Sequence, residues 1–233
     1  MQVTEALMSM GYSTVIHGIP VYFSFWTLLL AAGMFWEAKM YIELQLKHLR
    51  RFVRTGATPL ILASAFGAIF MILSIGLHEM AHGLVAARFG FHIVGAGVSW
   101  WGAYVTLPDG YTEGTPWAMI AVSFAGPATN IAISLILGLI VWFFPESLFE
   151  NTVQFVAYMN YRLGKLNFLP IFVLDGGKLL WGVIRLFISD SAMAMDLVLT
   201  VTVFTVIQLY KNRRSRDEIF EPTDGFERWL KEA

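Results

Sequence analysis

Residues 59–88 read PLILASAFGAIFMILSIGLHEMAHGLVAAR, an apolar run that carries two histidines and a glutamate in its last third. No charged residue occurs between Thr55 and Leu77, so the ionisable group follows a stretch almost long enough to cross a bilayer. On a helix, His78 and His82 lie on one face and can both bind one tetrahedral zinc ion. Glu79 then lies beside the metal, where it can take a proton from water. Surface histidines on a soluble helix would predict Lys, Glu or Gln on the opposite face, and that face has none here.

The composition limits the class of protein. Hydrophobic residues make up 57% of the 233 residues, charged residues only 14%, and mean hydropathy is +0.62. Such a chain is too apolar for a soluble domain and too long for one span, which indicates a multi-pass membrane protein, with the cell membrane as its expected location. A net charge of −1 without a broad basic patch gives no reason to expect a nucleic-acid partner. Without cysteine, a metal site must use His, Asp, Glu and water.

The predicted fold is an all-α polytopic membrane protein of about five to six transmembrane helices with a small membrane-embedded β segment. We expect a single domain over 1–233, with a catalytic core at about 59–180 and a charged soluble tail at 211–233. Residues 37–54 are basic and near-helical in their apolar spacing, which fits either a helix on the membrane surface or a solvated connector. Lys178–Ile188 is short and charged for a span. The predicted spans are Ile19–Trp36, Pro59–Arg88, Gly114–Phe144, Thr152–Leu174 and Ser191–Tyr210.

Phe91–Leu107 differs from the rest in being rich in valine, aromatic residues and glycine. This composition is typical of strands with tight turns or close backbone approaches. Irregular or β structure at membrane depth is tolerated only where protein or water covers its backbone. We therefore expect a hairpin packed beside the helix that carries His78 and His82, and we take this stretch as the only strand-like one.

Two imidazoles leave a hydrolytic zinc site one protein ligand short. Asp175 is the best candidate, because it ends an apolar run and precedes two glycines that allow close backbone approach. The alternatives are Asp196 as the ligand, or Asp175 as a mere cap for a helix beginning near Lys178. Asn130 is an amide inside a predicted span and needs a partner there.

Three segments resemble the signatures of the site-2 protease family of intramembrane zinc metalloproteases. They are HEMAH at 78–82, FAGPATN at 124–130 and NFLPIFVLDG at 167–176, in the order and spacing of that family. The resemblance implies one zinc ion per chain, with His78, His82 and Asp175 as ligands and Glu79 as general base. It also implies that Asn167 lies near the scissile carbonyl and that the stretch at 91–107 receives substrate. Val173 stands where relatives commonly have a second proline.

The predicted function is therefore an intramembrane zinc endopeptidase that cleaves transmembrane segments of substrate proteins within the lipid bilayer. One alternative is a zinc protease of another membrane class, although those enzymes typically take a glutamate as third ligand. Another is a non-catalytic protein that holds zinc or sequesters spans, for which Glu79 would have no use. Topology stays open, because five single crossings would put the basic stretch at 37–54 and the basic tail opposite the zinc side.

Overall fold

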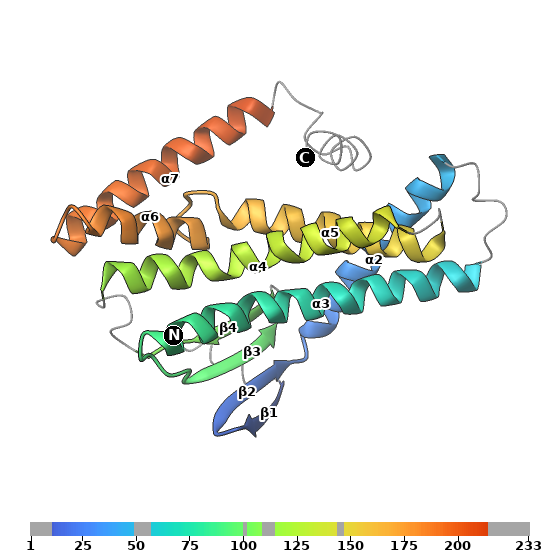
Figure 1. The fold of residues 1–233 in the computed structure, drawn as a ribbon, viewed down its shortest axis with the longest axis horizontal. Helices are drawn as coiled ribbons and strands as arrows, with labels where there is room; N and C mark the ends of the chain where they lie inside the picture. Colours follow the sequence, from blue (N-terminus) through green and yellow to red (C-terminus); the bar gives the residue numbers. More distant parts are fainter. Residues whose placement is uncertain (1–10, 49–56, 100–101, 109–114, 144–146, 214–233) are drawn as a thin grey trace.

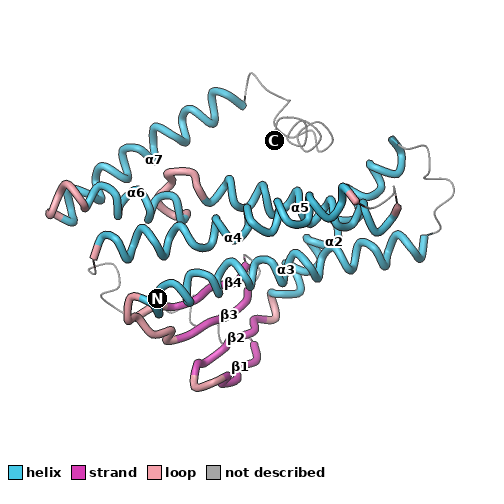
Figure 2. Tube along the Cα trace, in the orientation of Figure 1, coloured by secondary structure: helices cyan, strands magenta, loops and turns pink. Residues whose placement is uncertain are grey.

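Three helices lying side by side form the centre of the molecule (Figure 1). The structure, a computed structural model, describes residues 11–48, 57–99, 102–108, 115–143 and 147–213. The central helices are α3 (Ala57–Arg88), α4 (Pro116–Trp142) and α5 (Leu148–Asn167). Around them, α2 (Thr27–His48) packs obliquely on α3 and α5, α6 (Asp175–Arg185) packs on α4, and α7 (Ser191–Arg213) packs on α6. A four-stranded sheet lies against α3 (Figure 2).

Among the described residues, three helices are long and apolar enough to cross a membrane: α3, α4 and residues 191–212 of α7. They leave large apolar side chains uncovered, including Phe66 (56% exposed), Leu139 (59%) and Phe204 (62%). Exposed apolar surface of this extent is normal against lipid and costly against water. These helices agree with the predicted second, third and last spans. A total of five to six spans stays a prediction, because α2 and α5 do not meet the same length and composition criteria.

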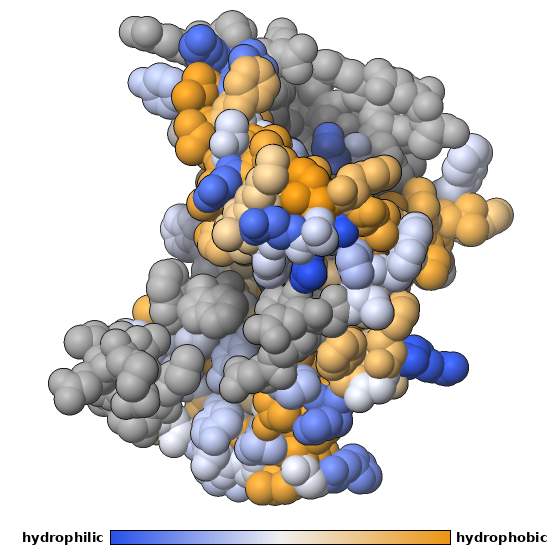
Figure 3. All heavy atoms as spheres, turned by 90° about the vertical axis from the view of Figure 1, so that its left-hand side faces the viewer, coloured by the Kyte–Doolittle hydropathy of each residue, from blue (hydrophilic) through white to orange (hydrophobic). Residues whose placement is uncertain are grey.

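The end of the bundle that carries α6 has a mixed surface. Hydrophobic and hydrophilic side chains alternate there when the molecule is viewed from that end (Figure 3). The predicted fourth segment, Thr152–Leu174, divides at this end: α5 stops at Asn167, and a short non-helical link leads to α6. A surface of this kind suits the zone where a bundle meets headgroups and water.

The N-terminal part corrects one prediction. Instead of starting a span at Ile19, the chain forms a hairpin of β1 (Gly11–Ile16) and β2 (Ile19–Ser24), and the following helix, α2, begins at Thr27. His17 and Gly18 join the strands with positive φ angles of 50° and 82°, as a two-residue primed turn requires. The aromatic, charge-free stretch after Gly18 has the hydropathy of a span, so hydropathy alone could not separate the two structures.

The predicted hairpin within Phe91–Leu107 is confirmed. It consists of β3 (Gly95–Ser99) and β4 (Gly102–Thr106), paired antiparallel and packed on α3. The expectation that this is the only strand-like stretch is wrong, because β3 also pairs in parallel with β2. The order β1-β2-β3-β4 makes β1 and β4 the two edges of the sheet, with β4 on the side of α3.

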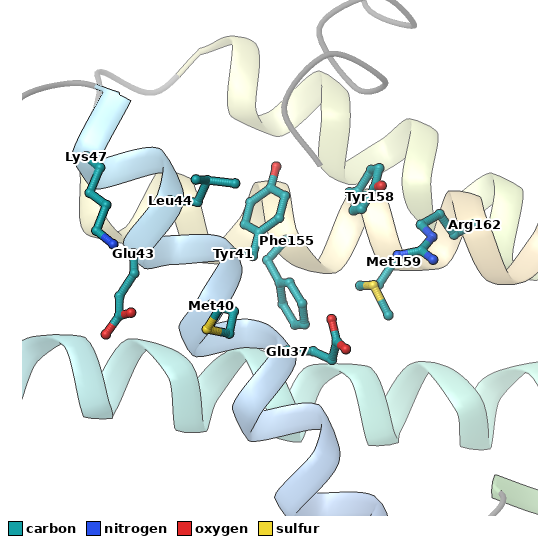
Figure 4. A pocket seen from close by; sticks show the side chains of 10 residues that line it. All are labelled: Glu37, Met40, Tyr41, Glu43, Leu44, Lys47, Phe155, Tyr158, Met159 and Arg162. Carbon is teal, nitrogen blue, oxygen red and sulfur yellow. The ribbon is translucent and has the colours of Figure 1, made fainter. Parts of the chain in front are cut away.

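A group of buried side chains joins α2 to α3 and α5. Residues 37–48, predicted as a membrane-surface helix or a connector, are the second half of α2 and bury Ile42 and Leu46 against Met71 and Phe155; residues 49–54 lie outside the described part. A cavity of about 150 Å³ opens between α2 and α5. Charged side chains such as Glu37 and Arg162 surround its aromatic rings (Figure 4). None of its lining residues belongs to the histidine cluster described next.

Candidate metal centre

Three buried side chains from two helices meet in the interior. His78 and His82 come from α3, one helical turn apart, and Asp175 is the first residue of α6. Their Nε2 atoms lie 3.1 Å apart. The Asp175 Oδ2 atom lies 3.1 Å from the first of them and 3.2 Å from the second. Asp175 thus joins two histidines that precede it by more than 90 positions, as the sequence predicts.

The size of this triangle is close to that of a zinc site. In a tetrahedral site with bonds of about 2.0–2.2 Å, neighbouring ligand atoms lie about 3.3–3.5 Å apart. The observed sides of 3.1–3.2 Å are only slightly tighter, and two imidazoles with a carboxylate form a common ligand set for catalytic zinc. Glu79 is a rival third ligand, since its carboxylate also lies within 4.8 Å of both histidines. Its nearer oxygen, however, is 3.9 Å from His78 Nε2, which suits a neighbour of the metal better than a ligand.

Each histidine is oriented by a hydrogen bond from its other ring nitrogen. His82 Nδ1 donates to the backbone carbonyl of Val122 at 2.6 Å, and His78 Nδ1 donates to Asn130 Oδ1. With hydrogen on Nδ1, the Nε2 lone pair of both rings is available to a metal. Asn130 is completely buried in α4, and His78 is a partner of the kind that an amide inside a predicted span needs.

Glycines allow the backbone to come this close to the cluster. A Cβ atom on Gly126 of α4 would collide with the Nε2 atoms of both histidines. On α6, Cβ atoms on Gly176 and Gly177 would collide with the backbone of residues 168–172. The close approach expected after Asp175 is thus present, and it holds the carboxylate over α3.

Asp175 lies in α6, outside the three helices that meet the span criteria. Lys178 Nζ lies 3.5 Å from the second oxygen, Oδ1. One oxygen of the carboxylate thus faces the imidazoles, and the other faces a lysine.

Glu79 contacts the sheet as well as the cluster. Its Oε2 accepts a hydrogen bond of 3.2 Å from the backbone N–H of Val105 in β4. Its Oε1 is the oxygen that faces His78. One carboxylate oxygen is thus anchored while the other points to the place where a metal would bind.

The remaining predicted residue is not brought into the cluster. Asn167 is half-buried at the end of α5, and among the described residues no hydrogen bond joins it to the histidines or to Asp175. The two cations of the same helix turn to aromatic rings: Arg162 lies over Tyr158 at 5.5 Å and Lys165 over Tyr161 at 5.0 Å. Each cation thus has an aromatic partner on its own helix.

Sequence reasoning missed Asn160, which is buried and hydrogen-bonded to Asn130, and Ser74, which is buried and hydrogen-bonded to Asn160. Ser74 interrupts the apolar helix α3 as Asn130 interrupts α4, whereas α5 carries several polar residues, so Asn160 does not stand out in it. The carbonyl of Val122 gives no such signal, since every residue has one.

Comparison with known proteins identifies the family of this chain. The sequence profile of Peptidase family M50 matches residues 66–150 and 144–209, which is more than half of the chain. A protein of Mycobacterium tuberculosis named as a candidate zinc metalloprotease, Rip3, is 33% identical over 122 residues, 51% of this chain and 30% of its own length. A zinc metalloprotease of Methanocaldococcus jannaschii is 28% identical over 121 residues, 50% of this chain and 34% of its own length. The chain thus spans about a third of these relatives.

The fold has a counterpart among solved structures. A site-2 protease from Methanocaldococcus jannaschii superimposes with a TM-score of 0.53 at 19% identity, covering 92% of this chain and 91% of the other. At that identity the likeness concerns the fold alone. The sequence profile carries the assignment, and it confirms the resemblance seen in the three motifs: the chain belongs to Peptidase family M50, the site-2 protease family of membrane metalloproteases.

Proposed function

We propose that this protein is an intramembrane zinc endopeptidase that cleaves transmembrane segments of other proteins. The main support is that the Nε2 atoms of His78 and His82 and the Oδ2 atom of Asp175 lie 3.1–3.2 Å from one another. They do so among helices whose outer surfaces suit lipid. Ionisable side chains at such depth are costly and are usually kept for function. The expected location is the cell membrane, with the bilayer and a membrane protein substrate as partners.

One zinc ion per chain would be held by His78, His82 and Asp175. Bound zinc supplies Lewis acidity, which makes water a nucleophile near neutral pH and polarises a carbonyl oxygen. Glu79 takes the proton of the attacking water on Oε1 and delivers it to the leaving nitrogen. Its other oxygen stays on the Val105 N–H, so the carboxylate keeps its direction during both transfers.

Asn167 is proposed to donate to the oxygen of the scissile carbonyl as negative charge develops there. Removal of one such donor in another hydrolase costs about 2.7–4 kcal/mol. The amide stands at the end of α5, beside the link that leads to Asp175. It is half-buried, so a bound substrate could reach it.

The substrate must be extended before it is cut, because the carbonyls of a transmembrane helix are already hydrogen-bonded. An unwound segment in lipid would leave backbone groups unpaired at a cost of several kcal/mol each. The outer edge of β4 offers replacement partners next to Glu79. We propose that the substrate pairs with this edge.

The test is Glu79→Gln, which keeps the size of the side chain and removes its ability to accept a proton. Cleavage of a fluorogenic transmembrane peptide should fall about 10²–10⁴-fold while zinc content stays normal. Glu43→Gln is the matched control, because Glu43 pairs with Lys39 on α2, away from the cluster, and its loss should leave cleavage unchanged.

Residual turnover within about tenfold of wild type would place the base elsewhere, since loss of a general base costs more than that. A wild-type protein that holds zinc but cleaves no peptide would instead support the non-catalytic alternative. Preferential cleavage of soluble peptides would support a membrane protease of another class.

A further inference from the structure

We infer that Asn160 is a positioning residue, which fixes the tautomer of His78 through Asn130. This inference rests on the proposed function, because it concerns how one proposed zinc ligand is prepared for the metal. Asn160 lies in α5 and does not touch the histidine cluster itself, so it acts through another side chain.

A continuous chain of hydrogen bonds links three helices. His78 of α3 donates from Nδ1 to Oδ1 of Asn130 in α4. Asn130 Nδ2 donates to Asn160 Oδ1 at 2.8 Å. Asn160 Nδ2 in turn donates to the carbonyl of Val156 at 2.8 Å and to Ser74 Oγ at 3.1 Å. Both asparagines are completely buried, so water does not offer replacement partners.

The direction of this chain is fixed at its far end. A backbone carbonyl such as that of Val156 can only accept a hydrogen bond. Ser74 gives its hydroxyl hydrogen to the carbonyl of Phe70 at 2.9 Å, so toward Asn160 it too acts as an acceptor. If the amide of Asn160 were turned over, its oxygen would face both acceptors. Its NH₂ group must therefore point to Val156 and Ser74, and its oxygen to Asn130.

The same logic passes on to the histidine. Because Asn160 presents an oxygen, Asn130 must present its NH₂ group there and its own oxygen to His78. His78 must then carry hydrogen on Nδ1, which leaves the Nε2 lone pair facing His82 and Asp175. His82 reaches the same state directly, by donating to the carbonyl of Val122.

Both histidines thus depend on carbonyl groups that only accept, one directly and one through two amides. Without the oxygen of Asn160, the amide of Asn130 is free to turn over and offer a donor to His78 Nδ1. The ring would then carry its hydrogen on Nε2, where it competes with a metal. Loss of such an orienting partner typically lowers metal affinity about 10–100-fold.

The experiment is nitrogen NMR of the full chain with ¹⁵N-labelled histidine, in detergent at mildly alkaline pH, before and after zinc removal. Asn160→Leu removes both polar atoms, whereas Asn160→Asp keeps an acceptor for Asn130 Nδ2. Asn151→Leu is the control, since Asn151 is also buried on α5 (3% exposed) but stands outside the chain of hydrogen bonds. Zinc affinity is measured in parallel by chelator competition.

Wild type should show the Nδ1–H form of His78 even without metal. Asn160→Leu should lose that form and bind zinc about 10–100-fold more weakly, while Asn151→Leu keeps both properties. Asn160→Asp should keep the Nδ1–H form, although a buried charge makes it the less stable protein. If Asn160 had a purely structural role, Asn160→Leu and Asn160→Asp would both disturb packing, and the two variants would not differ in the tautomer of His78.

Three results would overturn the inference: a majority of Nε2–H at His78 in metal-free wild type, a folded Asn160→Leu variant with unchanged tautomer, or a folded Asn160→Asp variant with a switched one. The wild-type measurement decides even if a variant fails to fold. No substrate is needed, so a failure here is distinguishable from a failure of the proposed proteolysis.

Discussion

At the scale of single residues, Asp175 has the role that a substitution tests most directly. Its Oδ2 lies within 3.2 Å of both imidazole Nε2 atoms. Asp175→Asn should weaken zinc binding, since a neutral amide oxygen coordinates poorly, and Asp175→Ala should weaken it further. His78→Ala removes a ligand, so it should lower zinc affinity by more than the roughly 10–100-fold that follows the loss of an orienting partner. Metal analysis of the purified proteins with chelator competition measures all three.

Asp196→Asn serves as the control for these substitutions. Asp196 was the rival ligand in the sequence, but it is exposed on α7, so its loss should leave zinc binding unchanged. Zinc retained at the wild-type level by Asp175→Ala would reject Asp175 as a ligand. The carboxylate of Glu79, 3.9 Å from His78, would then be the better third ligand.

The proposed ligands were predictable from the sequence because their chemistry dictates residue type and spacing. Two histidines four apart need a helix, and a carboxylate that must reach them needs small neighbours such as Gly176. The groups that orient the histidines were less predictable. The carbonyl of Val122 leaves no trace in residue type, and the pairing of Asn160 with Asn130 depends on how α4 and α5 pack.

At the scale of elements, the edge of β4 can be tested residue by residue. Successive N–H groups of a strand point to opposite sides. The N–H of Val105 points to Glu79, so that of Ala103 also points away from β3. Ala103→Pro removes this outward donor without removing a bond of the β3–β4 ladder. If substrate pairs with this edge, cleavage of a transmembrane peptide should fall sharply while zinc content stays normal.

The opposite edge of the sheet provides the control. The turn at His17 and Gly18 makes Ile16 and Ile19 a hydrogen-bonded pair, so the N–H of Ser13 points away from β2. Ser13→Pro therefore places the same lesion on β1 and should not affect cleavage. Normal cleavage by a folded, zinc-loaded Ala103→Pro protein would reject strand addition here and leave β4 as packing for α3.

The two hairpins also mark the limit of prediction at this scale. Valine, aromatic residues and closely spaced glycines indicated β3 and β4, because this composition is typical of strands with tight turns or close backbone approaches. The second strand of the β1–β2 hairpin falls within the predicted span at 19–36, because a short aromatic run has the same hydropathy in either structure. The dipeptide His17-Gly18 was the available signal, and it becomes decisive only once the strand across the turn is known.

At the scale of the whole molecule, the direction of the helices limits the topology. In Figure 1, α3 and α5 run one way and α4 runs the other, and α7 returns toward the end where α3 begins. Four passes that alternate in this way would bring the start of α3 and the end of α7 to the same side. The sequence is basic at both places, with Lys47, Arg50, Arg51 and Arg54 before α3 and Lys211, Arg213, Arg214 and Arg216 at the end of α7. The positive-inside rule therefore predicts that this side faces the cytosol.

The absence of cysteine makes this topology directly measurable, because single cysteines can be introduced without a background. Ala57→Cys at the start of α3 and Asn212→Cys near the end of α7 should react with a membrane-impermeant maleimide from the cytosolic side. Ser189→Cys, in the exposed link between α6 and α7, should react from the opposite side. All three are exposed and none changes the charge that sets orientation.

Reaction of Ser189→Cys and Asn212→Cys from one side would mean that α7 does not cross. Reaction of Ala57→Cys and Ser189→Cys from one side would mean that one of α3, α4 and α5 does not cross, and α5, which does not meet the span criteria, would be the first candidate.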